Sequence, residues 1–132
     1  RQIKQKIQTI PQVVLTGTVN RTQIDEILNK ADVLVCPSRQ DPMPTVAAEA
    51  MMNSVPCLIS DAAGTAAYLT DGENGMIFKS EDIDELSQKL EMCIRQPGQL
   101  GKMGMKARKV YENRFSMEVF ETAVLRIVKD LL

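Results

Sequence analysis

Two carboxylates in one short stretch are the residues of this sequence best placed to do chemistry. The stretch covers residues 31–50, reads ADVLVCPSRQDPMPTVAAEA, and holds Asp41 in a proline-rich turn and Glu49 in a run of small residues. If the residues between them were helical, the carboxylates would lie roughly 12 Å apart along the axis, at ~1.5 Å per residue. An acid and a base acting on one glycosidic bond need carboxyl groups about 5 to 10 Å apart. The spacing therefore fits two ends of one elongated ligand better than one reaction centre.

Each carboxylate is a candidate to hold hydroxyl groups. A carboxylate can accept hydrogen bonds from two hydroxyls at once, so Glu49 could hold a ribose diol and Asp41 a sugar hydroxyl. The helix expected to begin at Pro44 or Thr45 adds an anion site, because the unpaired N–H groups of its first turn attract a diphosphate without a basic side chain. Plainer roles stay open: Asp41 as a turn or capping residue, and Glu49 as a solvated helix residue.

The composition argues against several classes of site. Histidine, the commonest general base and metal ligand, is absent, which argues against Ser-His-Asp hydrolases and metallohydrolases, and we expect no metal. The cysteines Cys36, Cys57 and Cys93 are odd in number and have apolar neighbours, which is typical of buried thiols in a reducing compartment. The formal net charge is -1, so no basic field is available to collect nucleic acid.

Length and hydropathy predict one cytoplasmic domain. No apolar run approaches the ~20 residues that a bilayer span needs, and residues 1–6 lack the apolar core of a signal peptide. The chain begins at Arg1 in what reads as the middle of a helix, which indicates a fragment of a longer protein. Its 132 residues are enough for a single domain, residues 1–132.

Hydrophobic periodicity and turn residues predict helices that alternate with strands. The predicted strands are residues 12–17, 31–36, 56–60 and 76–78. The predicted helices are residues 1–10, 22–30, 44–53, 65–69, 80–95, 100–113 and 117–132. Ser80 is the predicted N-cap of the helix at 80–95. The apolar stripe of the last helix is predicted to be core rather than a membrane contact, because the charges beside it are of mixed sign; it consists of Phe120, Val124, Ile127 and Leu131.

This alternation predicts right-handed βαβ units. We therefore expect an α/β fold with a Rossmann-like parallel sheet of about four strands, flanked by helices and followed by a helical C-terminal tail. Ligands of such folds bind at the carboxyl ends of the strands. Those ends are the turn at Gly17, the loops at 37–44 and 61–64, and the vicinity of Lys79, and the loop at 37–44 contains Asp41.

A succession of motifs carries a family resemblance. Residues 37–78 read PSRQDPMPTVAAEAMMNSVPCLISDAAGTAAYLTDGENGMIF and resemble the C-terminal nucleotide-sugar-binding domain of family 4, or group 1, retaining glycosyltransferases of GT-B fold. The family pattern is approximately PSRxEPFGxxxxEAMAxGxPVVxSDxGGxxExxxDGxNGxxF. The resemblance covers about residues 12–95 and continues more loosely to the end. It implies the donor-binding part of an enzyme that transfers a sugar from a nucleoside diphosphate sugar to a hydroxyl acceptor, in cell-surface polysaccharide or glycan biosynthesis.

The resemblance assigns roles to both carboxylates and to the helix start. Glu49 matches the second glutamate of the family's Glu-x7-Glu motif, which holds the ribose hydroxyls. Asp41 stands at the first, which contacts the donor sugar, and these two are the candidate catalytic residues. The backbone N–H groups of Met43, Thr45 and Val46 fall where the family binds sugar and diphosphate.

The resemblance also implies a base-binding loop and parts outside this chain. Thr18 and Val19 match the loop whose backbone meets the base. The family's phosphate-binding arginine and lysine lie on a segment before Arg1; neither Arg1 nor Lys4 is their equivalent, and Arg39 is a weak substitute. The glycan or lipid-linked acceptor would bind an N-terminal domain, and the full-length protein could associate peripherally with a membrane. No cofactor is implied besides the donor, and this chain alone is expected to bind it weakly and to transfer nothing.

Departures from the family pattern keep alternatives open. Asp41 is one methylene shorter than glutamate, Pro44 replaces a glycine and removes an N–H, and Ala63 and Ala67 stand where glycine and glutamate are usual. One alternative is a non-catalytic glycosyltransferase-like lobe. Another is a nucleotide-sugar epimerase or dinucleotide-binding domain on the same architecture, although the latter expects a Gly-x-Gly-x-x-Gly loop after its first strand and the sequence has none.

Overall fold

A parallel sheet of three strands lies at the centre of the fold. The computed structural model describes residues 2–132, so expectations that fall on Arg1 lie outside the described residues. The strands β1 (Leu34–Cys36), β2 (Cys57–Ser60) and β3 (Met76–Phe78) are hydrogen-bonded in the order β1-β2-β3. All neighbours run parallel, with Val35 opposite Leu58 and Ile59 opposite Ile77. The predicted α/β class with a Rossmann-like parallel sheet is therefore confirmed.

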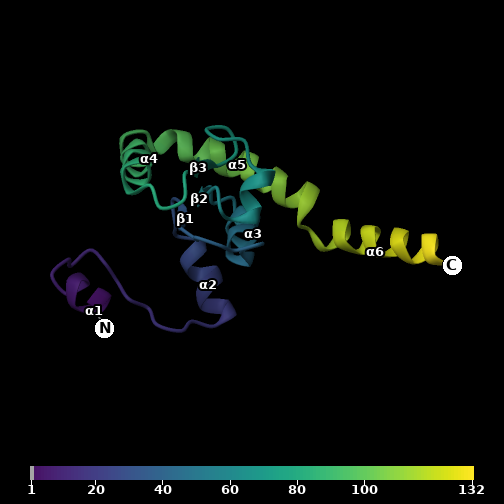
Figure 1. Ribbon diagram of the computed structural model, residues 1–132, viewed down its shortest axis with the longest axis horizontal. Coiled ribbons are helices and arrows are strands. Elements are labelled where there is room, and N and C mark those ends of the chain that lie inside the picture. The colour runs from purple at the N-terminus through teal and green to yellow at the C-terminus, as the bar shows by residue number, and fades with distance from the viewer. Residues whose placement is uncertain (1) are drawn as a thin grey trace.

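Helices precede, connect and follow these strands (Figure 1). They are α1 (Gln2–Ile7), α2 (Arg21–Leu28), α3 (Thr45–Met52), the 3-10 helix η1 (Gly64–Tyr68), α4 (Ile83–Arg95), α5 (Pro97–Arg114) and α6 (Met117–Leu131). In Figure 1, α6 projects away from the sheet as a separate arm, and α1 lies at the opposite end of the molecule. Among the helices of residues 2–132, none has the length and apolarity needed to cross a membrane.

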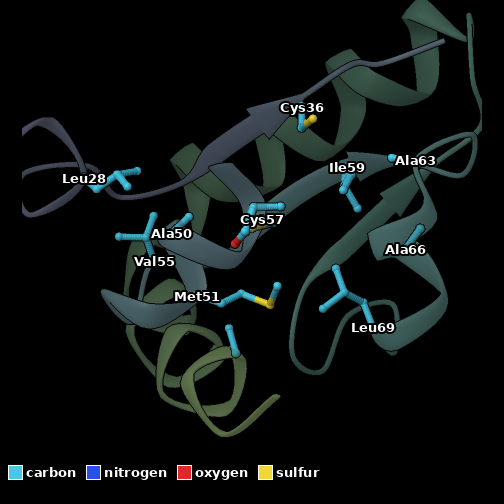
Figure 2. Packing of buried hydrophobic residues seen from close by; sticks show 12 residues of the cluster. Leu28, Cys36, Ala50, Met51, Val55, Cys57, Ile59, Ala63, Ala66 and Leu69 are labelled. Carbon is cyan, nitrogen blue, oxygen red and sulfur yellow. The ribbon is translucent and has the colours of Figure 1, made fainter. Parts of the chain in front are cut away.

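The central strand β2 is buried on both faces because its side chains alternate between two hydrophobic clusters. Cys57 and Ile59 face a cluster with Met51 of α3 and residues of η1 and α5 (Figure 2). Leu58 faces a second cluster, built with β3, α4 and α5. These three side chains of β2 are fully buried. Burial, with a smaller contribution from Cys36, raises the pKa of the Cys57 thiol to about 12, so this cysteine is inert core, as predicted for the thiols.

Small residues bring α3 close to its neighbours. Ala47 and Ala50 are fully buried, and they leave α3 slim enough to press on the sheet. Helix α3 also contacts α5, and in the turn just after α3 a Cβ added to Gly104 of α5 would lie 2.0 Å from the backbone oxygen of Ser54. Helix α3 is thus packed against both the sheet and α5.

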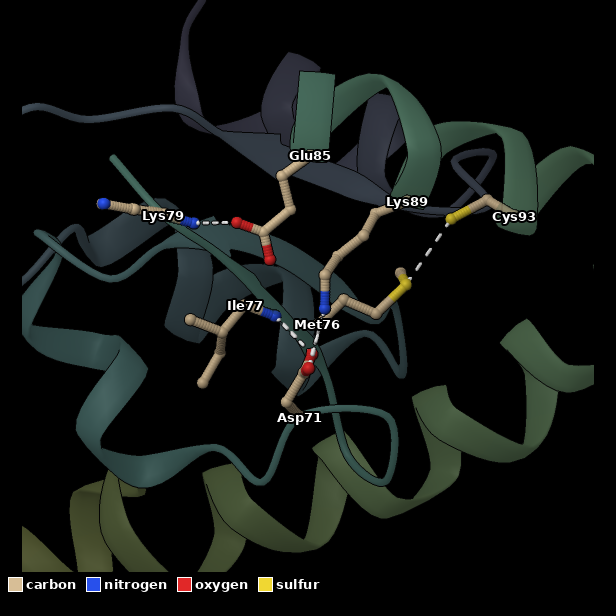
Figure 3. A network of polar contacts seen from close by, with 7 residues as sticks. All are labelled: Asp71, Met76, Ile77, Lys79, Glu85, Lys89 and Cys93. Atoms are coloured by element: carbon tan, nitrogen blue, oxygen red, sulfur yellow. Dashed lines mark hydrogen bonds and ion pairs between the residues drawn. The ribbon is translucent and has the colours of Figure 1, made fainter. Parts of the chain in front are cut away.

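An ion pair fastens the loop before β3 to α4 (Figure 3). Lys89 Nζ lies 2.8 and 2.7 Å from the two carboxylate oxygens of Asp71, and the backbone N–H of Ile77 donates to Asp71 Oδ1 at 2.7 Å. Burial raises the pKa of Asp71, but the Lys89 ammonium and the Ile77 N–H outweigh it and hold that pKa below its ordinary 3.8. The carboxylate form of Asp71 therefore contributes to the stability of this corner.

The predicted strand at residues 12–17 is wrong, and the described sheet has three strands instead of about four. The segment is irregular, and Val14 and Leu15 are 78% and 53% exposed. A strand needs a neighbour that completes its ladder of hydrogen bonds, and no strand within residues 2–132 pairs with this segment. The apolar residues of this segment predict a strand, but they do not determine whether a neighbouring strand is available to pair with it.

Two expectations about the helices are also corrected. The apolar stripe of α6 is not core within the described chain, because its members remain 40% to 80% exposed; they are Phe120, Val124, Ile127 and Leu131. Ser80 does not cap α4. Glu81 has a φ of 67° and turns the chain, so that Asp82 becomes the N-cap and accepts from the Glu85 N–H at 2.9 Å.

Candidate functional site

The loop that contains Asp41 is held at the carboxyl ends of β1 and β2. The hydroxyl of Ser60, the last residue of β2, donates to the Ser38 carbonyl at 2.5 Å. Further along, Asp41 forms a parallel bridge with Ala63, and the Gly64 N–H donates to the Asp41 carbonyl at 2.9 Å. The two loops that follow neighbouring strands thus form one unit at the edge where such folds bind ligands.

This unit depends on the absence of a side chain at residue 64. A Cβ built on Gly64 would lie 1.8 Å from the carbonyl oxygen of Pro42 and 2.8 Å from its carbonyl carbon. Both atoms belong to the backbone, so neither can swing aside as a flexible side chain would. The sequence shows a glycine at this position but not what touches it, and this requirement emerges only from the structure.

The first turn of α3 presents unpaired N–H groups beside that loop. Pro44 precedes the helix in extended conformation and supplies no side-chain cap. Within residues 2–132, the N–H groups of Thr45 and Val46 donate to no other group. A helix of eight residues concentrates a positive partial charge at this end, so an anion beside Thr45 and Val46 would be stabilised; that a diphosphate binds there stays a prediction.

Met43 differs from the other two predicted backbone donors. Its N–H donates to Asp41 Oδ1 at 3.1 Å, which closes a local turn within the loop. The plainer role considered for Asp41, a turn aspartate, is therefore realised in this structure. Asp41 and Met43 are brought together, but the Met43 N–H already donates to Asp41 Oδ1. A sugar hydroxyl at Asp41 would use the other carboxylate oxygen, Oδ2.

Glu49 lies one helical turn beyond Thr45 on the same face of α3. The axial separation of the two residues is about 6 Å, at ~1.5 Å per residue. The side chain of Glu49 is 18% exposed, and its Oε1 lies 3.0 Å from a terminal guanidinium nitrogen of Arg21. This ion pair joins α3 to the start of α2. Sequence analysis did not identify Arg21, and no sequence signal could have found it, because the two residues are far apart in the chain.

The predicted base-binding loop adjoins this ion pair. Gly17 takes a φ of 66°, a left-handed conformation that suits glycine, and it turns the chain into Thr18 and Val19. Thr18 is exposed and Val19 partly buried. Both residues precede Asn20, the N-cap of α2, so they lie within three positions in sequence of Arg21, whose side chain contacts Glu49.

Arg39, the weak substitute considered for the family's phosphate-binding residues, already forms an ion pair. Arg39 Nε lies 3.1 Å from Glu81 Oε1, and both side chains are largely exposed, at 82% and 66%. This pair connects the Asp41 loop with the loop before α4. Arg39 therefore bridges two loops of the ligand edge in this structure.

Comparison with known proteins gives one consistent result. The protein family described as "Glycosyl transferases group 1" matches residues 1–110. Among curated proteins, the chain is similar to the capsular polysaccharide biosynthesis glycosyltransferase CapM of Staphylococcus aureus, with 28% identity over 91 residues. That match covers 69% of this chain and 24% of CapM.

Solved structures share the fold at low sequence identity. Sucrose-phosphate synthase from Thermosynechococcus elongatus superimposes with a TM-score of 0.89 at 21% identity, over 98% of this chain and 33% of that one. HepE of Anabaena, solved in complex with UDP, gives a TM-score of 0.88 at 20% identity, over 98% of this chain and 36% of that one. The chain thus spans about a quarter of the curated relative and about a third of the solved chains.

Proposed function

Because the chain belongs to the group 1 glycosyl transferases, an enzymatic family, we propose that it carries the donor site of a retaining glycosyltransferase. The full-length protein would transfer a sugar from a nucleoside diphosphate sugar to a hydroxyl of a glycan or lipid-linked acceptor, in polysaccharide or glycan biosynthesis. The acceptor would bind a part of the protein outside this chain. The absence of a metal requirement and the cytoplasmic location remain predictions.

One observation carries the proposal: α3 presents free N–H groups and a carboxylate on one face, one turn apart. The N–H groups of Thr45 and Val46 fit a diphosphate, and Glu49, about 6 Å along the axis, fits the hydroxyls of the attached ribose. A nucleoside diphosphate has its phosphates and its ribose diol at such a spacing. The solved HepE structure with UDP supports this class of ligand for a protein of the same fold.

The same arrangement supports a mechanism in which this chain stabilises the leaving group. As the bond between the sugar and the diphosphate breaks, negative charge grows on the diphosphate next to the N-terminus of α3. Fixed N–H donors at Thr45 and Val46 stabilise that charge without rearrangement. Asp41 would hold a hydroxyl of the sugar, and Thr18 and Val19 would meet the base through their backbone.

A second candidate, a binding lobe without transfer activity, is favoured by the Asp41 turn. The Met43 N–H is engaged by Asp41, and Pro44 has no N–H to offer. Of the N–H donors that the family supplies near the sugar, the one at Met43 is therefore occupied and the one at residue 44 is absent. A lobe of this kind would bind the nucleotide and fail to activate the sugar.

Calorimetry and turnover of the full-length protein distinguish these candidates. UDP, GDP and ADP, and their glucose and mannose conjugates, are titrated into the wild type and Glu49→Ala. The proposal expects binding of at least one nucleotide, weakened about tenfold or more in Glu49→Ala, because a hydrogen bond to a charged group is lost. Release of nucleoside diphosphate from the bound sugar conjugate supports the enzyme, and binding without release supports the non-catalytic lobe. Binding of none of the nucleotides refutes the donor site.

A further inference from the structure

We propose that Arg21 is a positioning residue of the donor site: it fixes Glu49 so that one carboxylate oxygen, Oε2, is presented to the ribose. The two ribose hydroxyls would then not be equivalent, because one of them faces Oε2 and the other faces Oε1, which already contacts Arg21. This inference rests on the proposed function, since it assumes that Glu49 meets a ribose. The inference goes beyond the proposed function by assigning a role to Arg21 of α2.

The contact of the ion pair with the Glu49 carboxylate is at one oxygen, Oε1. The guanidinium nitrogen lies 3.0 Å from Oε1. Neither Glu49 oxygen accepts a hydrogen bond from residues 2–132, and neither is among their buried atoms that lack a partner, so both reach solvent, with the guanidinium contact at Oε1. A carboxylate held at Oε1 in this way presents its other oxygen, Oε2, in a fixed direction.

The start of α2 is rigid enough to position the guanidinium. Asn20 caps the helix: its Oδ1 accepts from the Gln23 N–H at 2.9 Å, and Gln23 Oε1 accepts from the Asn20 N–H at 2.8 Å. This reciprocal pair is a capping box, which fixes the first turn of a helix. Arg21 is the first residue of that turn, so the origin of its side chain is held even though the side chain is 65% exposed.

A second carboxylate strengthens the case for a positioning role. Asp25 Oδ1 lies 3.8 Å from Arg21 Nε, and this oxygen is buried without a hydrogen-bond partner among the described residues. The guanidinium therefore faces Asp25 of α2 and Glu49 of α3 together. Without it, two like charges on neighbouring helices would have no cation between them, and their repulsion would turn Glu49 away from its present direction.

The alternative role for Arg21 is that of a plug: its guanidinium would block the Glu49 carboxylate and compete with the ribose for it. A plug would have to bury the oxygens that the ligand uses, whereas both Glu49 oxygens still reach solvent beside Arg21. The two roles also predict opposite effects of removing the guanidinium. Loss of a plug would tighten nucleotide binding, and loss of a positioning contact would weaken it.

The test measures binding of UDP or GDP, whichever the wild type binds, and of its 2′-deoxy and 3′-deoxy forms to the full-length protein by calorimetry. We expect the two deoxy forms to differ in Kd by about tenfold in the wild type, the size of one charge-assisted hydrogen bond. In Arg21→Ala the parent nucleotide should bind about tenfold more weakly and the difference between the deoxy forms should fall within about twofold. Arg21→Lys, which keeps the positive charge but lacks the planar guanidinium, should recover part of the nucleotide affinity and part of the difference between the deoxy forms.

Controls separate this inference from a structural role and from the proposed function. Arg95→Ala removes a similarly exposed arginine, which forms an ion pair with Glu91 on α4, and should leave all three affinities unchanged. Arg21→Gln keeps most of the stem and gives a second variant without the charge. An unchanged deoxy difference in Arg21→Ala and Arg21→Gln, or tighter binding in either, would overturn the positioning role while the donor site stands. Unchanged binding in Glu49→Ala would instead refute the donor site itself.

Discussion

Replacing Gly64 by alanine tests whether the contact between the two ligand-edge loops positions the site. The added Cβ would lie 1.8 Å from the Pro42 carbonyl oxygen, so the loop must retreat by roughly 1 Å or more before the contact becomes tolerable. Gly64 does not have a positive φ, so the backbone conformation itself suits alanine. The expected effect is therefore purely steric.

The contact strain of Gly64→Ala should appear in both stability and activity. Overpacking of this kind costs about 1 to 3 kcal/mol of stability, and the hydrogen bond from the residue 64 N–H to the Asp41 carbonyl would stretch. Because Asp41 moves with the loop, a displacement of about 1 Å should lower kcat/KM for sugar transfer by about a hundredfold. Denaturant unfolding and steady-state release of nucleoside diphosphate, both on the full-length protein, measure the two effects.

Gly101→Ala is the matched control. A Cβ at Gly101 meets nothing within 4 Å, and the residue lies inside α5, so alanine should stabilise the helix by about 0.5 to 1 kcal/mol and leave activity unchanged. If Gly64→Ala matched the wild type in both stability and kcat/KM, the close approach of the loops would have no energetic importance, and the reasoning would be refuted.

Three further predictions follow from the core and the loop before β3. Asp71→Asn should destabilise the protein by about 1 kcal/mol at pH 7; because the folded-state pKa of Asp71 is depressed, this difference should fade as the pH drops below the ordinary 3.8, which urea unfolding at several pH values would show. Cys57, with a pKa of about 12 and no exposure, should resist iodoacetamide at pH 8 until denaturant unfolds the protein, as followed by mass spectrometry. Met51→Ala should cost about 2 to 5 kcal/mol, because its fully buried side chain would leave a cavity; a loss below 1 kcal/mol in denaturant unfolding would contradict the packing described for α3.

The sequence predicted the elements whose neighbours lie within this chain. The apolar runs that became β1, β2 and β3 and the small-residue helix α3 were located to within a few residues. The segment at residues 12–17 has equally strand-like residues, yet it has no partner in the described chain and stays irregular. Local pattern decides whether a strand can form, and pairing decides whether it does.

The candidate site was predictable as a set of chain positions and not as a set of contacts. The spacing of Thr45 and Glu49 follows from helix geometry, and the structure retains it. The pairs that decide how the site is used are Asp41 with the Met43 N–H, Arg21 with Glu49, and Gly64 with Pro42. Each depends on a rotamer or on the approach of two separate segments, which periodicity does not encode.

The exposed arm α6 has a consequence for the local dynamics of the protein. None of its residues is buried within the described chain, so little packing holds the helix beyond the hydrogen-bonded cap at Ser116. An isolated helix of 15 residues is only marginally stable in water, whereas α3 is fixed by fully buried side chains. Amide protons of α6 should therefore exchange with solvent through local fraying, orders of magnitude faster than those of α3, which exchange through global unfolding. Any surface that comes to cover the apolar face of α6 would be detected first as a slowing of that exchange.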